Sequence, residues 1–96
     1  MNHKQTANAA AHDLIRQIQS VKYMHKTTVR ILVDLLTDTA MSVSTGVPEE
    51  PPLGHVSLDE ASILGWIALD LARDRLGEDI HEGPIGKRLF DAGVCA

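Results

Sequence analysis

The sequence predicts an all-α fold, a helical hairpin in which a long helix folds back on a shorter antiparallel one. Neither proline nor glycine occurs from Ala7 to Thr45, which permits one uninterrupted helix. A loop with three prolines then separates this stretch from a second apolar helical pattern. The parts of this single small domain, 1–96, are a long helix, a loop, a second helix and a loosely ordered tail, at residues 6–43, 44–56, 57–76 and 77–96.

The predicted long helix is amphipathic. The residues of its apolar seam recur at alternating spacings of three and four and are Leu14, Ile18, Val21, His25, Thr28, Leu32, Leu35 and Thr39. A competing interpretation makes residues 27–33 a strand, because five of these seven residues are β-branched. No alternating partner strand is visible elsewhere in the chain, so the helix is preferred.

The second helix has a well-specified start and end. Ser57 and Glu60 match the S-x-x-E capping box ahead of an apolar run, and Gly77 marks the end. The small residues on one face permit close helix packing and are Ala61, Gly65, Ala68 and Ala72. The apolar residues that point away from this stripe are Ile63, Trp66 and Leu69. Apolar groups on several sides predict that neighbours cover this helix on two sides.

The tail that follows Gly77 is rich in glycine, which predicts loose order. Within it, Ile85 to Ala92 can form a short third helix with Leu89 and Phe90 docked on the rest of the chain.

The two main helices are predicted to differ in length. At a rise of about 1.5 Å per residue the first spans roughly 55 Å and the second roughly 30 Å. The N-terminal half of the long helix then has no partner within its own chain, although it carries apolar side chains. We therefore expect a homodimer, or another protein, to cover it. The residues expected at this interface are Leu14, Ile15, Arg16, Ile18, Val21, Lys22, His25, Lys26, Val29, Arg30 and Leu32.

Charge is divided unevenly along the chain. Residues 1–30 hold five basic residues against one acidic residue, whereas residues 31–82 hold two against eleven. An antiparallel second helix brings its acidic residues towards basic ones of the first, Asp70, Asp74 and Glu78 opposite Arg30, Lys26 and Lys22. Exposed pairs of this kind stabilise little, so they select the arrangement more than they hold it together.

Composition excludes several classes of protein. The single cysteine, Cys95, rules out a disulfide framework and favours a reducing, cytoplasmic compartment. Met1–Ala11 has no long apolar core, so a secretory signal is not expected. The densest apolar run, Val29–Leu36, contains two charges and is too short to span a bilayer, so no membrane association is expected.

The sequence contains no recognisable catalytic constellation. Its five histidines are scattered, and none forms a close pair on one helix as metal ligands usually do. We find no nucleophile beside a base, no glycine-rich phosphate loop and no paired carboxylates in an evident cleft. We therefore expect no catalytic residue, no metal and no cofactor, and a protein that is not an enzyme.

Two other functions stay open as alternatives. Helical chorismate mutases resemble this chain in size and in a long first helix with basic residues, here Arg16, Lys22, Lys26 and Arg30. That resemblance implies a dimeric enzyme or a small-anion binder, but the acidic second half does not supply the further basic residues that such a pocket needs. The same basic residues suggest a nucleic-acid binder, which the acidic body disfavours.

The long helix, the acidic proline-rich loop and the segment Asp59–Ala72 resemble, in layout, the small two-helix regulatory proteins of bacteria, among them quorum-sensing anti-activators. That resemblance implies a protein that sequesters a transcription factor by occupying its dimerisation surface. The function predicted from the sequence is therefore that of a non-enzymatic regulator that self-associates and inhibits a partner protein through an amphipathic helix.

Overall fold

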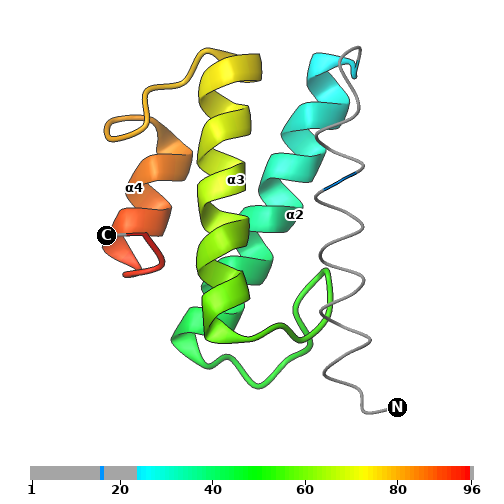
Figure 1. Ribbon diagram of the computed structural model, residues 1–96, viewed down its shortest axis with the longest axis vertical. Helices are drawn as coiled ribbons and strands as arrows, with labels where there is room; N and C mark the ends of the chain where they lie inside the picture. The colour runs from blue at the N-terminus through cyan, green and yellow to red at the C-terminus, as the bar shows by residue number, and fades with distance from the viewer. Residues whose placement is uncertain (1–15, 17–23, 96) are drawn as a thin grey trace.

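The computed structural model describes Arg16 and residues 24–95. Three helices of two turns or more follow one another in this part of the chain, α2 (Lys26–Thr45), α3 (Leu58–Leu76) and α4 (Pro84–Asp91). α2 and α3 form an antiparallel hairpin, and α4 packs on the other side of α3 (Figure 1). The described residues contain no strand. The predicted all-α hairpin is therefore confirmed, and the alternative of a strand at residues 27–33 is wrong because these residues lie within α2.

The long first helix does not continue through residues 24 and 25. Met24 and His25 are not helical, and His25 is the N-cap of α2 with extended backbone angles. Its imidazole Nδ1 accepts a hydrogen bond from the backbone N–H of Thr27 at 3.2 Å. The prediction of one helix over residues 6–43 is therefore wrong at this point, because a histidine side chain satisfies an amide that the preceding turn of a continuous helix would otherwise bind. Residues 6–23, apart from Arg16, lie outside the described residues.

The described helices of the hairpin are nearly equal in length. α2 has 20 residues and α3 has 19, so each spans about 30 Å at the usual rise of an α-helix. The predicted mismatch in length between the two main helices is therefore wrong, because the break at residues 24 and 25 makes α2 only one residue longer than its partner.

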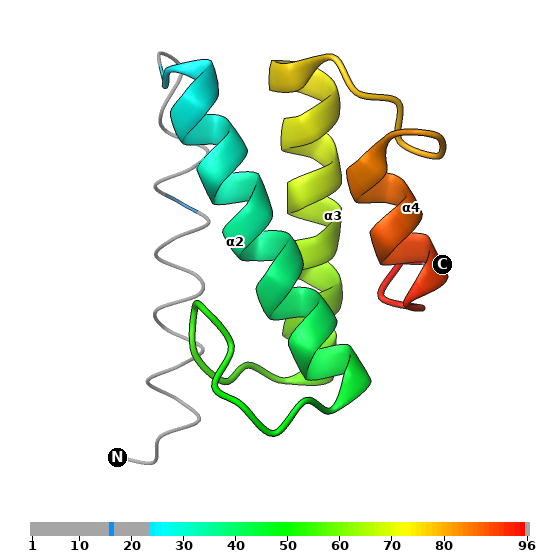
Figure 2. The same ribbon diagram turned by 180° about the vertical axis from the view of Figure 1, so that it is seen from behind.

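The core of the molecule is built by all three helices and the segment after α4, and α2 and α3 lie side by side in both views (Figures 1 and 2). The buried apolar residues of the core are Val29, Val33, Leu36 and Ala40 of α2, Ala61, Leu64, Ala68, Leu69 and Ala72 of α3, Ile85 and Leu89 of α4, and Val94 and Cys95 after it. Three of the five α3 residues are alanines, which let neighbouring helices approach closely. This confirms the close packing that the small residues of the second helix predicted.

Two buried threonines of α2 satisfy their hydroxyl groups within the helix. Thr37 and Thr39 donate to the carbonyl oxygens four residues earlier, those of Val33 and Leu35, at 2.7 and 2.8 Å. Thr39 also accepts a hydrogen bond from the backbone N–H of Leu53 at 3.1 Å. The proline-rich loop is thereby attached to the middle of α2.

The predicted boundaries of α3 are confirmed. The Ser57 hydroxyl accepts from the backbone N–H of Glu60 at 3.2 Å, and the Glu60 carboxylate accepts from the backbone N–H of Ser57 at 3.4 Å. At the other end Gly77 has a φ of 69°, a left-handed conformation that residues with a Cβ adopt only at a cost. Both ends of α3 are therefore fixed by local chemistry.

Loss of the capping box is expected to lower stability measurably. Replacing Ser57 with alanine leaves the Glu60 N–H without its side-chain acceptor, which typically reduces the free energy of unfolding by about 1 kcal/mol. Urea denaturation measures this difference. Ser44→Ala, the same change near the end of α2, is the control and is expected to change stability by no more than a few tenths of a kcal/mol. Equal effects of the two changes would contradict a capping role for Ser57.

The C-terminal segment is packed rather than loose. The predicted short helix over residues 85–92 is confirmed as α4, which begins with Pro84 in its first turn. Val94 and Cys95, which follow it, are buried, and the Ser62 hydroxyl donates to the Val94 carbonyl oxygen at 3.3 Å. Gly83 and Gly86, which predicted loose order, instead permit close contact with the backbone of Asp79 and Ile80.

Gly65 permits the contact of α3 with the C-terminal segment. A Cβ built on Gly65 would lie 2.8 Å from Val94 Cγ1 and 3.2 Å from Cys95 Sγ. The stripe of small residues on α3 therefore also admits the C-terminal segment, which packs against Gly65. α3 is thus covered on two sides, as the distribution of its apolar residues predicted (Figure 2).

Polar contacts join the three helices at their edges. Arg88 of α4 pairs with Asp38 of α2, with 2.6 Å between Nη2 and Oδ1. Arg75 of α3 donates from Nη2 to the Met24 carbonyl oxygen at 3.0 Å, which holds the segment before α2 against the end of α3. In the described part of the chain, none of the helices has the length and apolar character that crossing a membrane requires.

Candidate docking surface on α3 and α4

Apolar and aromatic side chains gather on one exposed face of α3 and α4. We call this surface the aromatic face and define it by Ile63, Trp66, His81 and Phe90. The ring centroids of Trp66 and Phe90 lie 5.9 Å apart with an interplanar angle of 83°, an edge-to-face contact. The imidazole of His81 stacks on Phe90 with centroids 5.2 Å apart. The contacting rings therefore come from α3, from α4 and from the connection between these helices.

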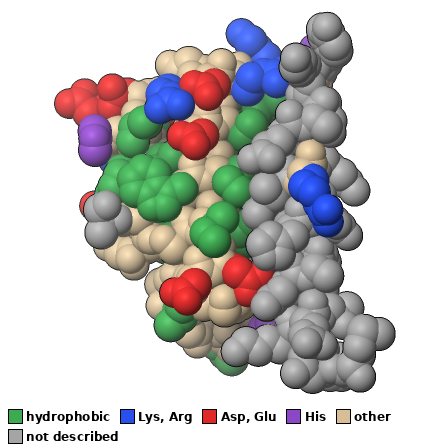
Figure 3. Space-filling model, viewed as in Figure 1, with side chains coloured by type: hydrophobic (Ala, Val, Ile, Leu, Met, Phe, Trp, Pro, Cys, Tyr) green, Lys and Arg blue, Asp and Glu red, His purple; other side chains and the backbone are tan. Residues whose placement is uncertain are grey.

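The aromatic face is exposed although its composition is apolar. Trp66 is 39% exposed and Ile63 is 47% exposed, and both are large hydrophobic residues. Figure 3 shows hydrophobic side chains gathered over this side of the molecule, with charged side chains above and below them. Contiguous apolar surface of this kind on a small protein often marks a site where another molecule binds.

The position of the face follows from the helical period of α3. Ile63 and Trp66 are three residues apart, so they lie on the same side of the helix, away from its buried alanines. The sequence correctly predicted that these two residues point away from the small-residue stripe. Leu69, which was expected to do the same, is buried.

Charged residues flank the aromatic face along α3. Asp59 lies in the first turn of α3, and a group of three charges, Asp70, Arg73 and Asp74, lies towards its end. Arg73 contacts Asp74 at 2.8 Å through Nε and Asp70 at 3.5 Å through Nη2. The hydrogen bond from Arg73 lowers the pKa of Asp74, and the same contact raises the pKa of Arg73. Arg73 and Asp74 therefore both remain ionised at neutral pH.

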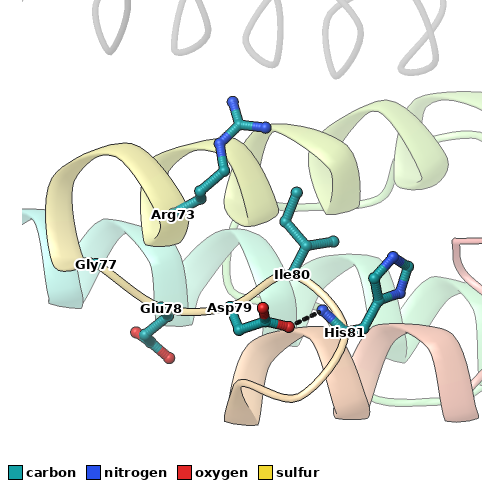
Figure 4. Close-up of a pocket in the computed structure, with 6 residues that line it drawn as sticks. All are labelled: Arg73, Gly77, Glu78, Asp79, Ile80 and His81. Carbon is teal, nitrogen blue, oxygen red and sulfur yellow. Dashed lines mark hydrogen bonds between the residues drawn. The ribbon is translucent and has the colours of Figure 1, made fainter.

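A shallow open pocket lies beside this group, where the chain turns from α3 towards α4 (Figure 4). Its lining residues are Arg73, Gly77, Glu78, Asp79, Ile80 and His81. The Asp79 carboxylate accepts hydrogen bonds from the backbone N–H groups of His81 and Glu82, both at 2.8 Å. These two bonds lower the pKa of Asp79, so their stabilising effect is complete above the unfolded pKa and is lost as the pH falls through the lower folded value.

The side chains that line the pocket stabilise the turn between α3 and α4 and form no reactive group. Asp79 organises the backbone, and Figure 4 shows Arg73 and Glu78 pointing to opposite sides of the connection. Among the residues that line it there is no nucleophile beside a base. The described residues also contain no group of three or more side chains that is able to hold a metal ion.

An ion pair joins the two main helices, but with a different pairing from the predicted one, because Arg30 pairs with Glu78 and not with Asp70. Arg30 Nη1 lies 2.9 Å from Glu78 Oε2, which joins the first part of α2 to the end of α3. The Glu78 side chain is only 13% exposed, and neither of its carboxylate oxygens accepts a hydrogen bond in the described part of the chain. Arg30 therefore compensates this buried charge by proximity of charge rather than by an aligned hydrogen bond. Asp70 and Asp74 pair with Arg73 on their own helix instead of with α2.

The other predicted interface residues take several different positions. Val29 is fully buried in the core between α2 and α3, so it is not part of an exposed surface, and Leu32 is partly buried. His25 is exposed as the cap of α2 rather than part of an apolar seam. Arg16 is exposed, and Leu14, Ile15, Ile18, Val21 and Lys22 lie outside the described residues.

Lys26 is also exposed, and with Thr27, Arg30 and Leu76 it lines a second shallow pocket at the start of α2. Arg30 is already paired with Glu78. The described residues therefore bring together few of the basic side chains on which the small-anion alternative depended.

Sequence reasoning missed the contribution of α4 to the aromatic face. His81 and Phe90 lie 15 and 24 residues after Trp66, so helical periodicity within α3 gives no sign that they meet it. One available signal is composition, because the chain has only three Phe, Trp or Tyr residues and two of them are in direct contact here.

No family model matches the chain, and comparisons with curated proteins and with solved structures give no match.

Proposed function

We propose that the chain is a non-enzymatic regulator that self-associates and binds another protein, which it holds in an inactive form. The observation that carries this proposal is the aromatic face, where Ile63 and Trp66 are large apolar residues in contact with water. α3 is the amphipathic helix that presents them. An exposed helical face with an aromatic anchor suits helix-in-groove recognition, in which side chains spaced by three and four residues enter a complementary apolar surface.

The charges around the face support recognition of a protein rather than a lipid or a nucleic acid. Acidic residues stand at both ends of the face, at Asp59 and at Asp70, and both are exposed. Acidic groups repel phosphates, whereas in a protein interface they orient a partner that carries basic residues at matching positions. The layout shared with anti-activators makes a transcription factor the natural candidate for the partner that is inhibited.

The substitution Ile63→Asp is expected to abolish self-association. The change places a charge in the middle of the apolar surface, and because Ile63 is already 47% exposed, the folded hairpin should tolerate it. Light scattering over a dilution series, at low and high salt, gives the absolute mass of wild type and variant. We expect a dimer for the wild type and a monomer for the variant.

Ile31→Asp is a matched control for this experiment. Ile31 is 55% exposed and lies on α2, so the variant adds the same charge at a comparable exposure away from the aromatic face. It should self-associate as the wild type does. If both variants weaken association equally, or if neither does, the aromatic face is not the surface that binds. Circular dichroism spectra of all three proteins establish that the helical content is unchanged.

A further inference from the structure

Four exposed residues form a row along one side of α3, with an acidic residue at each end and two apolar residues between them. We call them the α3 row, and they are Asp59, Ile63, Trp66 and Asp70. They follow one another at spacings of four, three and four residues, which keep side chains on one side of a helix. The row is about three turns or roughly 16 Å long, and its apolar centre belongs to the aromatic face.

Both ends of the α3 row carry negative charge. Asp59 is exposed and forms no ion pair with another described residue. At the other end Arg73 contacts both Asp74 and Asp70, so two carboxylates share one guanidinium group and a net negative charge is left. Asp70 has the longer of these contacts, at 3.5 Å, and its side chain is 59% exposed. Asp70 is therefore accessible to a further donor from outside the chain.

The charges of α4 and of the turn before it do not offset this negative charge. Glu82 and Asp91, which directly follow the two rings contributed from this side, are both exposed. Lys87 is exposed as well, but Arg88 is already paired with α2. Residues 24–95 as a whole contain 12 acidic and 6 basic residues, a net charge of −6. A positively charged partner is therefore attracted to this part of the molecule from a distance.

We propose that the aromatic face binds a basic amphipathic helix of another protein, which lies along the α3 row. The proposal rests on the proposed function and adds the chemistry and the spacing of the partner segment. Two apolar residues of that segment pack on Ile63 and Trp66. A lysine or arginine about one turn beyond them on each side donates to Asp59 and to Asp70. An apolar centre between charged ends is the usual arrangement of such an interface.

The charges favour this partner over a second copy of the chain. In a pair of α3 helices packed through the aromatic face, whether parallel or antiparallel, each end of the row meets an end that is also negative. Self-association through this face therefore depends on its apolar residues, and high salt strengthens it by screening the repulsion. Binding of a basic helix is instead strongest at low salt. Because both use the same surface, a basic helix should dissociate the dimer.

Two synthetic peptides of about 20 residues, long enough to form a helix, test the proposal. Both are built from alanine and glutamine with two leucines at the centre. One carries lysine and the other glutamate at the two flanking positions, at the spacings of the α3 row. Fluorescence anisotropy of the labelled peptides gives the dissociation constants. We expect the lysine peptide to bind at least tenfold more tightly than the glutamate peptide at low salt, with a smaller difference at high salt.

The double variant Asp59→Asn, Asp70→Asn removes the charge from both ends of the α3 row. The dissociation constant of the lysine peptide should then rise about fivefold at low salt. The matched control is Glu49→Gln, Glu50→Gln, which removes two charges from exposed residues of the loop between α2 and α3 and should leave the constant within about twofold. If circular dichroism shows a loss of helix in the first variant, Asp70→Asn alone replaces it, with Glu49→Gln as its control.

The possible failures of this proposal and of the proposed function are distinct. Equal binding of the two peptides, or equal effects of the row and loop variants, would overturn the basic partner and leave the aromatic face as an apolar docking surface. Failure of both peptides to bind would also overturn it, without affecting a dimer that Ile63→Asp abolishes. A wild type that is monomeric at every concentration would contradict the proposed self-association, whereas selective binding of the lysine peptide would still support the basic partner.

Discussion

Alanine in place of Gly86 is expected to detach α4 from the rest of the protein. A Cβ at this position would collide with the backbone carbonyl oxygen of Ile80, in the connection that precedes α4. The clash is with backbone, so rotation of a flexible side chain does not relieve it. Overpacking in a well-packed interior typically lowers the free energy of unfolding by 1 to 3 kcal/mol, and we expect a loss of about 3 kcal/mol here. In a domain of this size that corresponds to a fall in Tm on the order of 10 to 20 °C.

The single tryptophan of the chain makes this result easy to follow, because Trp66 contacts Phe90 of α4. Detachment of α4 should change the tryptophan emission before the hairpin itself unfolds, whereas circular dichroism reports the hairpin. Lys87→Ala is the control, since Lys87 is the next residue of α4 and is exposed. A Gly86→Ala variant with the Tm and emission of the wild type would show that the connection at Ile80 adjusts without loss.

Truncation of Leu36 to alanine is expected to be the most damaging change between α2 and α3. Leu36 is one of the largest fully buried side chains and lies in the core that joins the two helices. Removing its three outer carbon atoms loses their burial and leaves a cavity, a change that commonly lowers the free energy of unfolding by 2 to 5 kcal/mol. Urea denaturation should show a loss of about 3 kcal/mol, with an unchanged m value if unfolding remains two-state.

The same substitution at Leu58 provides the comparison. Leu58 is 66% exposed at the start of α3, so Leu58→Ala removes the same atoms from water rather than from the core. Its effect should remain within about 0.5 kcal/mol, as for most surface substitutions. If the two variants lost equal stability, the packing between α2 and α3 would not be the main source of stability.

The elements of the fold that were predictable are those determined by local chemistry. The capping box at Ser57 and the left-handed glycine at Gly77 are both visible in short stretches of sequence, and they place the ends of α3 to within a residue. The break at His25 was not predictable in the same way. The break involves neither proline nor glycine, and histidine is an uncommon N-cap residue. Because the apolar periodicity continues through residue 25, the sequence pattern predicts an uninterrupted helix there.

The candidate site was predictable only where it lies on one helix. Trp66 and Ile63 were expected to point away from the small residues of α3, and they do. The contact of Trp66 with Phe90 depends on how α4 packs, and that packing depends on the absence of side chains at Gly65 and Gly86. In the sequence Gly65 belongs to the small-residue stripe of the second helix, whereas Gly86 indicates a flexible tail, because composition does not distinguish a glycine that loosens a chain from one that admits a neighbour.

Spatial order repeats chain order in this molecule, because α3 lies between α2 and α4 and each helix packs mainly against the next one along the chain. During synthesis the hairpin can therefore assemble before α4 emerges, and α4 then adds to a surface that already exists. In reverse, the C-terminal segment is the unit whose opening disturbs the fewest contacts. The buried Cys95 thiol, whose pKa is raised by that burial, would become reactive only in molecules that have opened there.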